Sequence, residues 1–213
     1  MAKNLKRGTF ITLEGCEGCG KSTQLKLLYG FLKKERFPVL MTREPGGTAI
    51  GDAVRRVLLD VRNGGMSVIC ETLLYMASRA QLVEEVILPK LQEKKVVLCD
   101  RWLDATIAYQ GYAGSVDVPW IERLGRWVTQ GVKPDLSLFL DLPVACGLRR
   151  ARGRSLDRME KKSLRFHEKV RRGYLEIAKR EPKRFKRIPI RETDGIGEIH
   201  RKIQEGVLSV LCR

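Results

Sequence analysis

Residues 15–22 read GCEGCGKS and match the pattern G-x-x-x-x-G-K-[ST]. The run TFITLE at residues 9–14 precedes them as a candidate buried strand, and residues 22–36 carry leucines at mostly helical spacing. In this setting the glycines let the backbone turn tightly and aim N–H groups at phosphate oxygens, and the helix adds the positive end of its dipole. The pattern predicts a phosphate-binding loop (P-loop), which restricts the chain to an α/β fold.

Each residue of this loop has a place in the predicted nucleotide site. Lys21 would reach the β and γ phosphates as a catalytic cation, and the Ser22 hydroxyl would bind Mg²⁺. We expect ATP to bind along the whole loop. Its residues are Gly15, Cys16, Glu17, Gly18, Cys19, Gly20, Lys21 and Ser22.

The same loop contains a C-x-x-C pair, Cys16 and Cys19, which is typical of redox or metal sites. Glu17 between them would oppose thiolate formation, and both cysteines occupy free positions of the P-loop pattern. We therefore favour phosphate chemistry. Oxidation that joins the two thiols and stops ATP binding remains a second hypothesis.

Short apolar runs alternate with helical patterns along the rest of the chain. Further strands are predicted at residues 38–42, 96–99, 136–140 and 185–190, and helices at 49–59, 68–92, 143–150, 164–180 and 196–211. Such alternation is typical of a parallel sheet covered by helices on both faces. We expect a single domain over residues 1–213, with a P-loop NTPase-like, three-layer α/β fold and a five-stranded parallel sheet.

The formal net charge of +16 is unevenly spread, since residues 149–191 contain 18 Lys or Arg against 5 Asp or Glu. Such a segment predicts an anionic partner: a nucleotide, a nucleic acid or a membrane surface. No apolar run is long enough to span a bilayer, and the N-terminal sequence lacks a signal-peptide pattern. We therefore expect a cytoplasmic protein with no membrane partner, and with reduced cysteines.

Polar residues follow the second and third predicted strands, where ligands of parallel α/β sheets bind. The segments are TREPGGT, then DRW, then AYQG. Tyr75 and Arg79 lie four residues apart on the predicted helix 68–92, so they share one helix face. The candidate ligands at these places are Arg43, Pro45, Tyr75, Arg79, Asp100, Arg101, Tyr109 and Gln110.

The segments EGCEGCGKSTQ, TREPGGT, LLYMASRAQ, DRW, TIAYQG, GVKPDLSLFLDLPV and LDRME occur in this order. Together they resemble bacterial thymidylate kinase, a P-loop nucleoside monophosphate kinase, over roughly residues 8–180. The resemblance implies that ATP phosphorylates dTMP to dTDP in dTTP synthesis, with Mg²⁺ as the cofactor. It also implies a homodimer of packed helices, for which residues 68–92 and 120–128 offer apolar faces.

The resemblance also implies a role for each candidate at the dTMP site. Arg79 and the catalytic Arg101 would grip the dTMP phosphate with Arg43 beside them, because a guanidinium fork fits that anion. Tyr75 would stack on the thymine ring, and Pro45 would line the same pocket.

The sugar, the base edge and the metal have their own implied partners. Glu17 would accept a hydrogen bond from the sugar 3′-OH, and Tyr109 would crowd the 2′ position and favour deoxyribose. Gln110 would lie near the base. Asp100 would hold Mg²⁺ together with Ser22, as a Walker B carboxylate does.

Family members carry a catalytic arginine either in the P-loop or in a mobile lid. Gly18 stands at the P-loop position, so the lid type is implied, with a short lid at about residues 149–161. We favour Arg152 or Arg154, since the preceding helix could still hold Arg149 and Arg150. Arg158 is expected to position adenine or the lid itself.

Two residues depart from the usual family pattern. Ala105 stands where a serine is usual, and Trp102 replaces a smaller aromatic residue or histidine. Another nucleoside monophosphate kinase with altered base choice is therefore the nearest alternative. A non-catalytic P-loop protein that binds nucleic acid is a second alternative, but the catalytic lysine and acid are present, so we do not expect a nucleic-acid partner.

Overall fold

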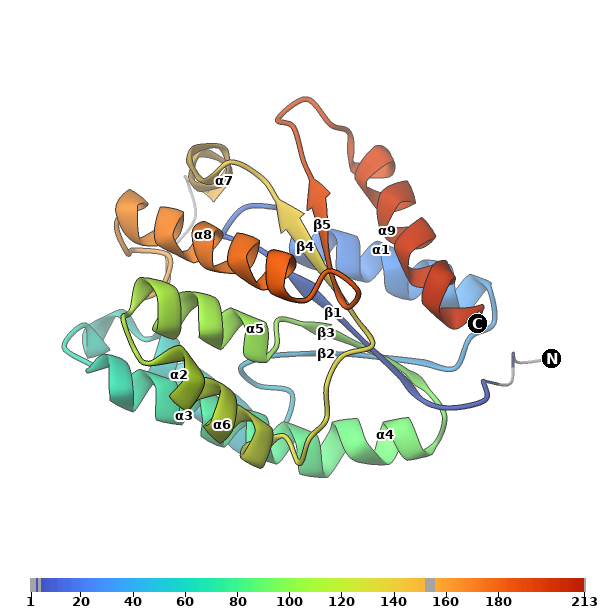
Figure 1. Cartoon of the computed structure of the whole chain (residues 1–213), viewed down its shortest axis with the longest axis horizontal. Helices are drawn as coiled ribbons and strands as arrows, with labels where there is room; N and C mark the ends of the chain where they lie inside the picture. Colours follow the sequence, from blue (N-terminus) through green and yellow to red (C-terminus); the bar gives the residue numbers. More distant parts are fainter. Residues whose placement is uncertain (1–2, 4, 152–155, 213) are drawn as a thin grey trace.

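Five parallel strands form one sheet in the order β2-β3-β1-β4-β5 (Figure 1). The computed structural model describes residues 3, 5–151 and 156–212. The strands are β1 (Thr9–Glu14), β2 (Val39–Arg43), β3 (Val96–Asp100), β4 (Leu136–Asp141) and β5 (Phe185–Pro189). Thr9 lies opposite Val96 of β3, and Ile11 lies opposite Leu136 of β4, so β1 is central. The predicted five-stranded parallel sheet is confirmed.

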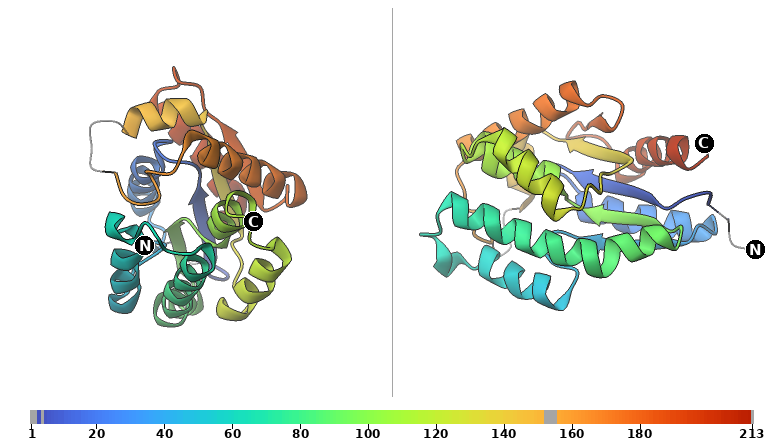
Figure 2. Two further views of the ribbon diagram at one scale, coloured as in Figure 1. Left: turned by 90° about the vertical axis from the view of Figure 1, so that its left-hand side faces the viewer. Right: turned by 60° about the horizontal axis from the view of Figure 1, so that its bottom comes forward.

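Helices cover both faces of the sheet, as Figure 2 shows. One face of the sheet packs on α1 (Lys21–Lys34) and α9 (Ile196–Leu211) through side chains such as Ile11, Leu138 and Ile203. The opposite face packs on the remaining layer through Phe10 and Phe139. Because successive strand residues alternate between faces and both faces are covered, β1 and β4 are buried along their whole length.

The other α-helices of the described residues follow the same chain order. They are α2 (Ala49–Leu59), α3 (Val68–Leu82), α4 (Leu88–Gln92), α5 (Leu103–Thr106), α6 (Val118–Val128), α7 (Val144–Ala151) and α8 (Leu164–Arg180), with a 3₁₀ turn at Val61–Asn63. Side-chain caps explain why α2, α3 and α8 begin where the sequence predicted. Thr48, Ser67 and Ser163 each accept a hydrogen bond from a backbone N–H in the first turn of these helices.

Two segments differ from the predicted helices. The predicted helix 68–92 is divided by a π-helical segment, Val83–Ile87, which separates α3 from α4. A second π-helical segment, Ile107–Ala113, continues from the end of α5 and precedes α6, and it was not predicted. Short π segments often occur at functional sites, and this one carries Tyr109 and Gln110. Within the described part of the chain, no helix combines the length and apolar character that crossing a membrane requires.

Candidate active site

A cavity of about 550 Å³ opens where the P-loop meets the carboxyl ends of β2 and β3. Most predicted site residues line it. These are Glu17, Gly18, Cys19, Gly20, Lys21, Ser22, Arg43, Pro45, Tyr75, Arg79, Asp100, Arg101, Tyr109 and Gln110. Gly15 and Cys16 are not among the described lining residues, and Arg152 and Arg154 lie outside the described part of the chain.

The P-loop lysine is held by the loop itself. The Lys21 ammonium donates to the carbonyl oxygens of Gly15 (2.9 Å) and Cys16 (3.0 Å), and it is nearly buried. The Cys16 and Cys19 thiols are both free and buried. Burial, with the neighbouring Cys19, raises the pKa of Cys16 to about 12, so this thiol is held in its unreactive form. The geometry therefore favours phosphate chemistry over redox chemistry.

Gly18 has a conformation and a neighbour that both require glycine. Its φ is +69°, and an added Cβ would lie 2.0 Å from the carbonyl oxygen of Gly147 on α7. A Cβ on Gly147 would in turn lie 2.1 Å from the Glu17 carbonyl oxygen. The P-loop and α7 thus pack backbone against backbone, and no side chain fits at residue 18 without a shift of one of them.

Ser22 and Asp100 form an oxygen-rich pair at the cavity. The Ser22 hydroxyl donates to Asp100 Oδ2 at 3.2 Å. Asp100 Oδ1 is buried and has no hydrogen-bond partner among the described residues. Hydroxyl and carboxylate oxygens are the ligands that Mg²⁺ prefers, so this donor set fits the Mg²⁺ that the resemblance implies.

Arg101 is fixed at the end of β3 from several sides. Its backbone has a φ of +71°, an uncommon conformation for a residue with a side chain. Its Nη2 donates to Glu17 Oε1 (2.6 Å) and to the Tyr109 hydroxyl (3.0 Å), and that hydroxyl also donates to Glu17 Oε1 (2.8 Å). The three predicted residues therefore form one hydrogen-bonded cluster.

The charge state of Glu17 follows from this cluster. Burial favours the neutral carboxyl, but the charges of Arg101 and Lys21 and the Tyr109 hydroxyl outweigh it and lower the pKa of Glu17 to about 2. Glu17 is therefore an anion at neutral pH, and its carboxylate can accept hydrogen bonds from a ligand.

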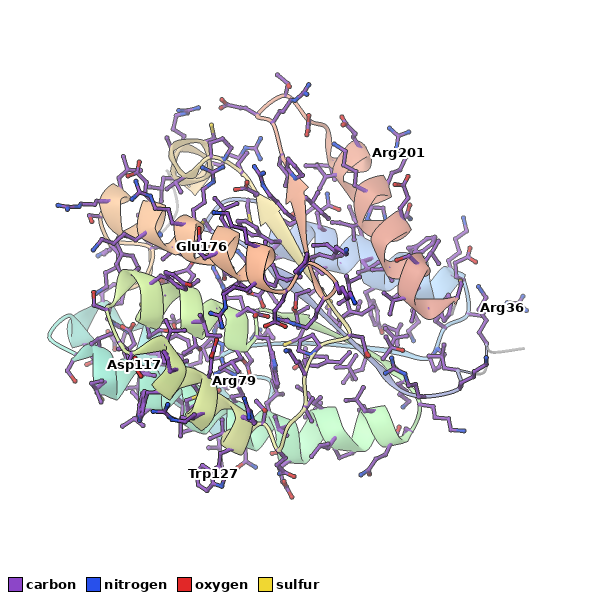
Figure 3. All side chains as sticks on the ribbon, in the orientation of Figure 1. Arg36, Arg79, Asp117, Trp127, Glu176 and Arg201 are labelled. Atoms are coloured by element: carbon purple, nitrogen blue, oxygen red, sulfur yellow. The ribbon has the colours of Figure 1, made fainter. Side chains whose placement is uncertain are left out.

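Arg79 is enclosed more tightly than Arg101. Its side chain is 1% exposed, and its Nε and Nη2 contact both oxygens of Glu44, the closest at 2.7 Å. Nη2 also donates to Thr106 Oγ1 (2.9 Å), and the guanidinium lies 5.6 Å from the centre of the Trp102 ring. Figure 3 shows Arg79 inside the molecule. Burial outweighs the attraction of Arg79 and raises the pKa of Glu44 to about 7.

Comparison with known proteins places the chain in a family. A sequence profile of thymidylate kinase matches residues 13–203. A thymidylate kinase of Geotalea uraniireducens is 48% identical over 212 residues, covering 96% of this chain and 99% of its own. The one of Geotalea daltonii is 50% identical over 186 residues, covering 84% and 87%. The chain belongs to the thymidylate kinase family.

A solved structure supports the fold of this family member. The crystal structure of thymidylate kinase from Ehrlichia chaffeensis superposes with a TM-score of 0.77 at 32% identity, covering 94% of this chain and 99% of that one. The resemblance drawn from the sequence motifs is confirmed, and so is the P-loop NTPase-like α/β fold. The roles of individual site residues stay predictions.

Gln110, which is expected near the base, belongs to a second hydrogen-bonded cluster together with Glu71 and Arg158. The Gln110 amide donates to Glu71 Oε1 (2.7 Å), and Glu71 Oε2 pairs with Arg158 Nη1 (2.5 Å). Arg158 also donates to the Leu58 carbonyl (2.7 Å) and is buried. Arg158 was expected to position adenine or the lid itself. Its contacts with α2 and α3 tie the end of the predicted lid segment to the body of the kinase, and its role stays a prediction.

Several cavity residues were missed by sequence reasoning. Arg55 and Leu59 line the cavity from α2, and Arg55 Nη1 donates to the Pro45 carbonyl (2.9 Å). They are four residues apart, so the same helix-face argument that selected Tyr75 and Arg79 could have found them. Glu44, Trp102, Thr106, Asp157, Met159 and Glu160 also line it.

The first two arginines of the predicted lid segment, Arg149 and Arg150, lie on α7, as expected. Arg149 pairs with Glu192 (2.8 Å), away from the cavity lining. Arg150 does line the cavity and donates to the Glu192 carbonyl (3.1 Å). Arg150 is therefore a third candidate to approach the phosphates beside Arg152 and Arg154.

Proposed function

We propose that this protein transfers the γ phosphoryl group of ATP to the phosphate of dTMP, giving dTDP for dTTP synthesis. The observation that carries the proposal is the shared cavity. It brings the P-loop lysine, the Ser22–Asp100 pair and the Arg101–Glu17–Tyr109 cluster to one place. Membership of the thymidylate kinase family supports the same activity.

Phosphoryl transfer needs positioning and positive charge more than covalent chemistry. In this proposal the P-loop N–H groups and the Lys21 ammonium bind the β and γ phosphates of ATP. To do so, Lys21 exchanges its bonds to the Gly15 and Cys16 carbonyls for phosphate oxygens. Because the amine is already at the loop and nearly buried, this exchange needs only a small movement.

Magnesium completes the donor site. Ser22 and Asp100 would hold the ion, with the unsatisfied Asp100 Oδ1 as one ligand oxygen. When bound, Mg²⁺ neutralises charge on the phosphate oxygens.

The acceptor side of the cavity fits a deoxyribonucleotide. Arg101 holds the dTMP phosphate, with Arg43 and Arg79 near it. The ionised Glu17 carboxylate accepts a hydrogen bond from the sugar 3′-OH, and Tyr109 occupies the space beside C2′. These assignments are supported by the positions of the five side chains around one cavity.

The base is positioned by Tyr75 and Gln110 in this proposal. Tyr75 projects from α3 into the cavity and can stack on thymine, with Pro45 across from it. The Gln110 amide is oriented by its hydrogen bond to Glu71, and this fixed orientation would let it contact the edge of the base. The transition-state arginine comes from the lid segment, as Arg152 or Arg154 with Arg150 as a third candidate, because Gly18 leaves no side chain at the P-loop position that carries an arginine in other family members.

A coupled assay tests the proposed activity. Purified protein with ATP and Mg²⁺ is offered dTMP, dUMP, CMP, AMP and GMP, and ADP release is followed. We expect dTMP to be the preferred acceptor. Preference for any other acceptor contradicts the proposal and favours the kinase with altered base choice.

We also propose that the protein is a cytoplasmic homodimer that pairs through α2 and α3. Ile50, Val57, Ile69 and Leu73 are exposed apolar residues on these two helices. A second copy would cover the apolar face that these four residues form. Trp127 on α6 is also 79% exposed and projects from the edge of the molecule in Figure 3. Light scattering after size exclusion should give twice the chain mass, and Leu73→Glu should give a monomer.

A further inference from the structure

Tyr174 on α8 is a fully buried tyrosine whose hydroxyl lies behind the cavity. Its ring stacks on Phe139 (centroids 4.9 Å apart) and on Phe185 (6.2 Å). A buried hydroxyl needs partners, and this one has two: it donates to Glu14 Oε2 (3.1 Å) and accepts from Arg101 Nη1 (3.2 Å). The ring therefore packs in the core, and the hydroxyl connects the Glu14 carboxyl to the Arg101 guanidinium.

Arg101 is held from two opposite sides as a result. Nη1 faces Tyr174, whereas Nη2 faces Glu17 and Tyr109. Three of its five N–H donors are thus bound to described residues, and the others remain for a ligand. Glu17 and Tyr109 line the cavity, so their contacts with Arg101 can change when a substrate enters. The bond from Tyr174 comes from the interior.

Neither Tyr174 nor Glu14 is among the described residues that line the cavity. Glu14 is the last residue of β1, in the middle of the sheet, and it is fully buried. The Tyr174 hydroxyl is therefore anchored to the most central strand, and it can act on a ligand only through Arg101.

Helix α8 is itself fixed at the active-site end of the sheet. Arg171 pairs with Asp141 at the end of β4 (2.6 Å), and the Cys16 thiol of the P-loop contacts the His167 carbonyl (3.9 Å). His167, Arg171 and Tyr174 follow each other at four and three residues, so they occupy one face of α8. These contacts keep the Tyr174 hydroxyl in place beside Arg101.

We propose that Tyr174, anchored by Glu14, is a positioning residue that orients the Arg101 guanidinium for the acceptor phosphate. The proposal deepens the proposed function and rests on it, since the acceptor phosphate is that of dTMP. Arg101 binds the phosphate, and Tyr174 determines the plane in which its free N–H groups point.

Tyr174→Phe tests this proposal, because it removes the hydroxyl and keeps the ring that packs on Phe139. A hydrogen bond to a charged group predicts a loss of about tenfold in kcat/KM for dTMP. KM for ATP should change less than twofold, although the midpoint of thermal unfolding should fall because Glu14 loses its hydrogen-bond partner. Unchanged dTMP kinetics would overturn the proposal. An equal loss toward both substrates would show a structural role instead.

Two further variants sharpen the result. Tyr112→Phe removes a hydroxyl beside α8 that does not line the cavity, and it should leave dTMP kinetics unchanged. In an Arg101→Lys background, Tyr174→Phe should have less than a twofold further effect, because the planar fork that it orients is gone. A persisting tenfold effect there would mean that Tyr174 does not act through Arg101.

Failure of the proposed function would look different. Wild-type protein that does not prefer dTMP contradicts the proposed activity, whatever Tyr174→Phe does. Wild-type protein that phosphorylates dTMP while Tyr174→Phe matches it contradicts only the positioning role.

Discussion

Two arginine–glutamate pairs border the same cavity and behave differently. Arg101–Glu17 lies at the P-loop, where further cations and a tyrosine hydroxyl surround the carboxylate, and the pKa of Glu17 is lowered to about 2. Arg79–Glu44 is more buried, with Thr106 and the Trp102 ring beside the guanidinium, and burial raises the pKa of Glu44 to about 7. The chemistry of the two pairs is the same, so the surroundings decide which one is available to a ligand and which one supports the structure.

The largest expected effect comes from removing the cation of the Arg101–Glu17 pair. Arg101→Ala should lower kcat/KM for dTMP by about a thousandfold, the upper range for loss of one preorganised charged donor. Steady-state kinetics with dTMP varied at saturating ATP measures this. Near-normal turnover would contradict the role of Arg101 and leave Arg79 and Arg43 as the phosphate ligands.

Matched charge removals should separate the two pairs by stability. Glu44→Ala removes the carboxyl that the buried Arg79 donates to and should lower the free energy of unfolding by about 3 kcal/mol. Glu17→Ala affects a less enclosed pair and should lower it by only about 1 kcal/mol. Denaturant unfolding of both variants against wild type measures the difference. Equal losses would mean that burial does not distinguish the pairs.

The two carboxylates should also give opposite pH dependences. The folded pKa of Glu44 lies above its ordinary value of 4.5, so its contribution to the free energy of unfolding falls as pH rises from about 4.5 to about 7. The folded pKa of Glu17 lies below 4.5, so its contribution is present above that pH and is lost as pH falls toward 2. Unfolding free energies of wild type, Glu17→Gln and Glu44→Gln between about pH 2 and about pH 8 test the signs. If the unfolding free energy of wild type rises relative to that of Glu44→Gln as pH increases, the assignment for Glu44 is contradicted.

The smallest expected effect concerns Ala105, which lines the cavity next to Thr106, the partner of Arg79. Ala105→Ser adds a hydroxyl at the substrate side and should raise kcat/KM for dTMP by up to about fivefold, the value of one neutral hydrogen bond. Competition assays with dTMP and dUMP would show whether base choice changes as well. A lowered efficiency would mean that the methyl group of Ala105 is needed for packing.

The sequence predicted the parts of the site that depend on local order. The P-loop, β1, α2, α8 and α9 were placed at their observed bounds or within a residue or two, because caps and apolar periods are local signals. The stretch 103–113 has no regular apolar period, so α5 and the π-helical turn were missed. Tyr109 and Gln110 were selected because they follow the third predicted strand, and their roles came from the family resemblance.

The pairing of charges could not be predicted in the same way. Glu44 and Arg79 lie 35 residues apart, and Glu17 and Arg101 lie 84 apart, so only the fold brings them together. Their pKa values differ because Glu17 has Arg101, Lys21 and the Tyr109 hydroxyl around it, whereas Glu44 has Arg79 alone among the described residues. The pairing of Arg158 with Glu71 likewise joins residues far apart in the sequence.

The contact between Gly18 and Gly147 limits how the proposed lid arginine could be relocated. Moving it into the P-loop by one substitution at residue 18 would place a side chain against the α7 backbone, where an added Cβ would lie 2.0 Å from an oxygen. The P-loop arrangement is therefore inaccessible in a single step. It requires α7 to be rebuilt first, so the two catalytic designs of the family are separated here by packing rather than by chemistry.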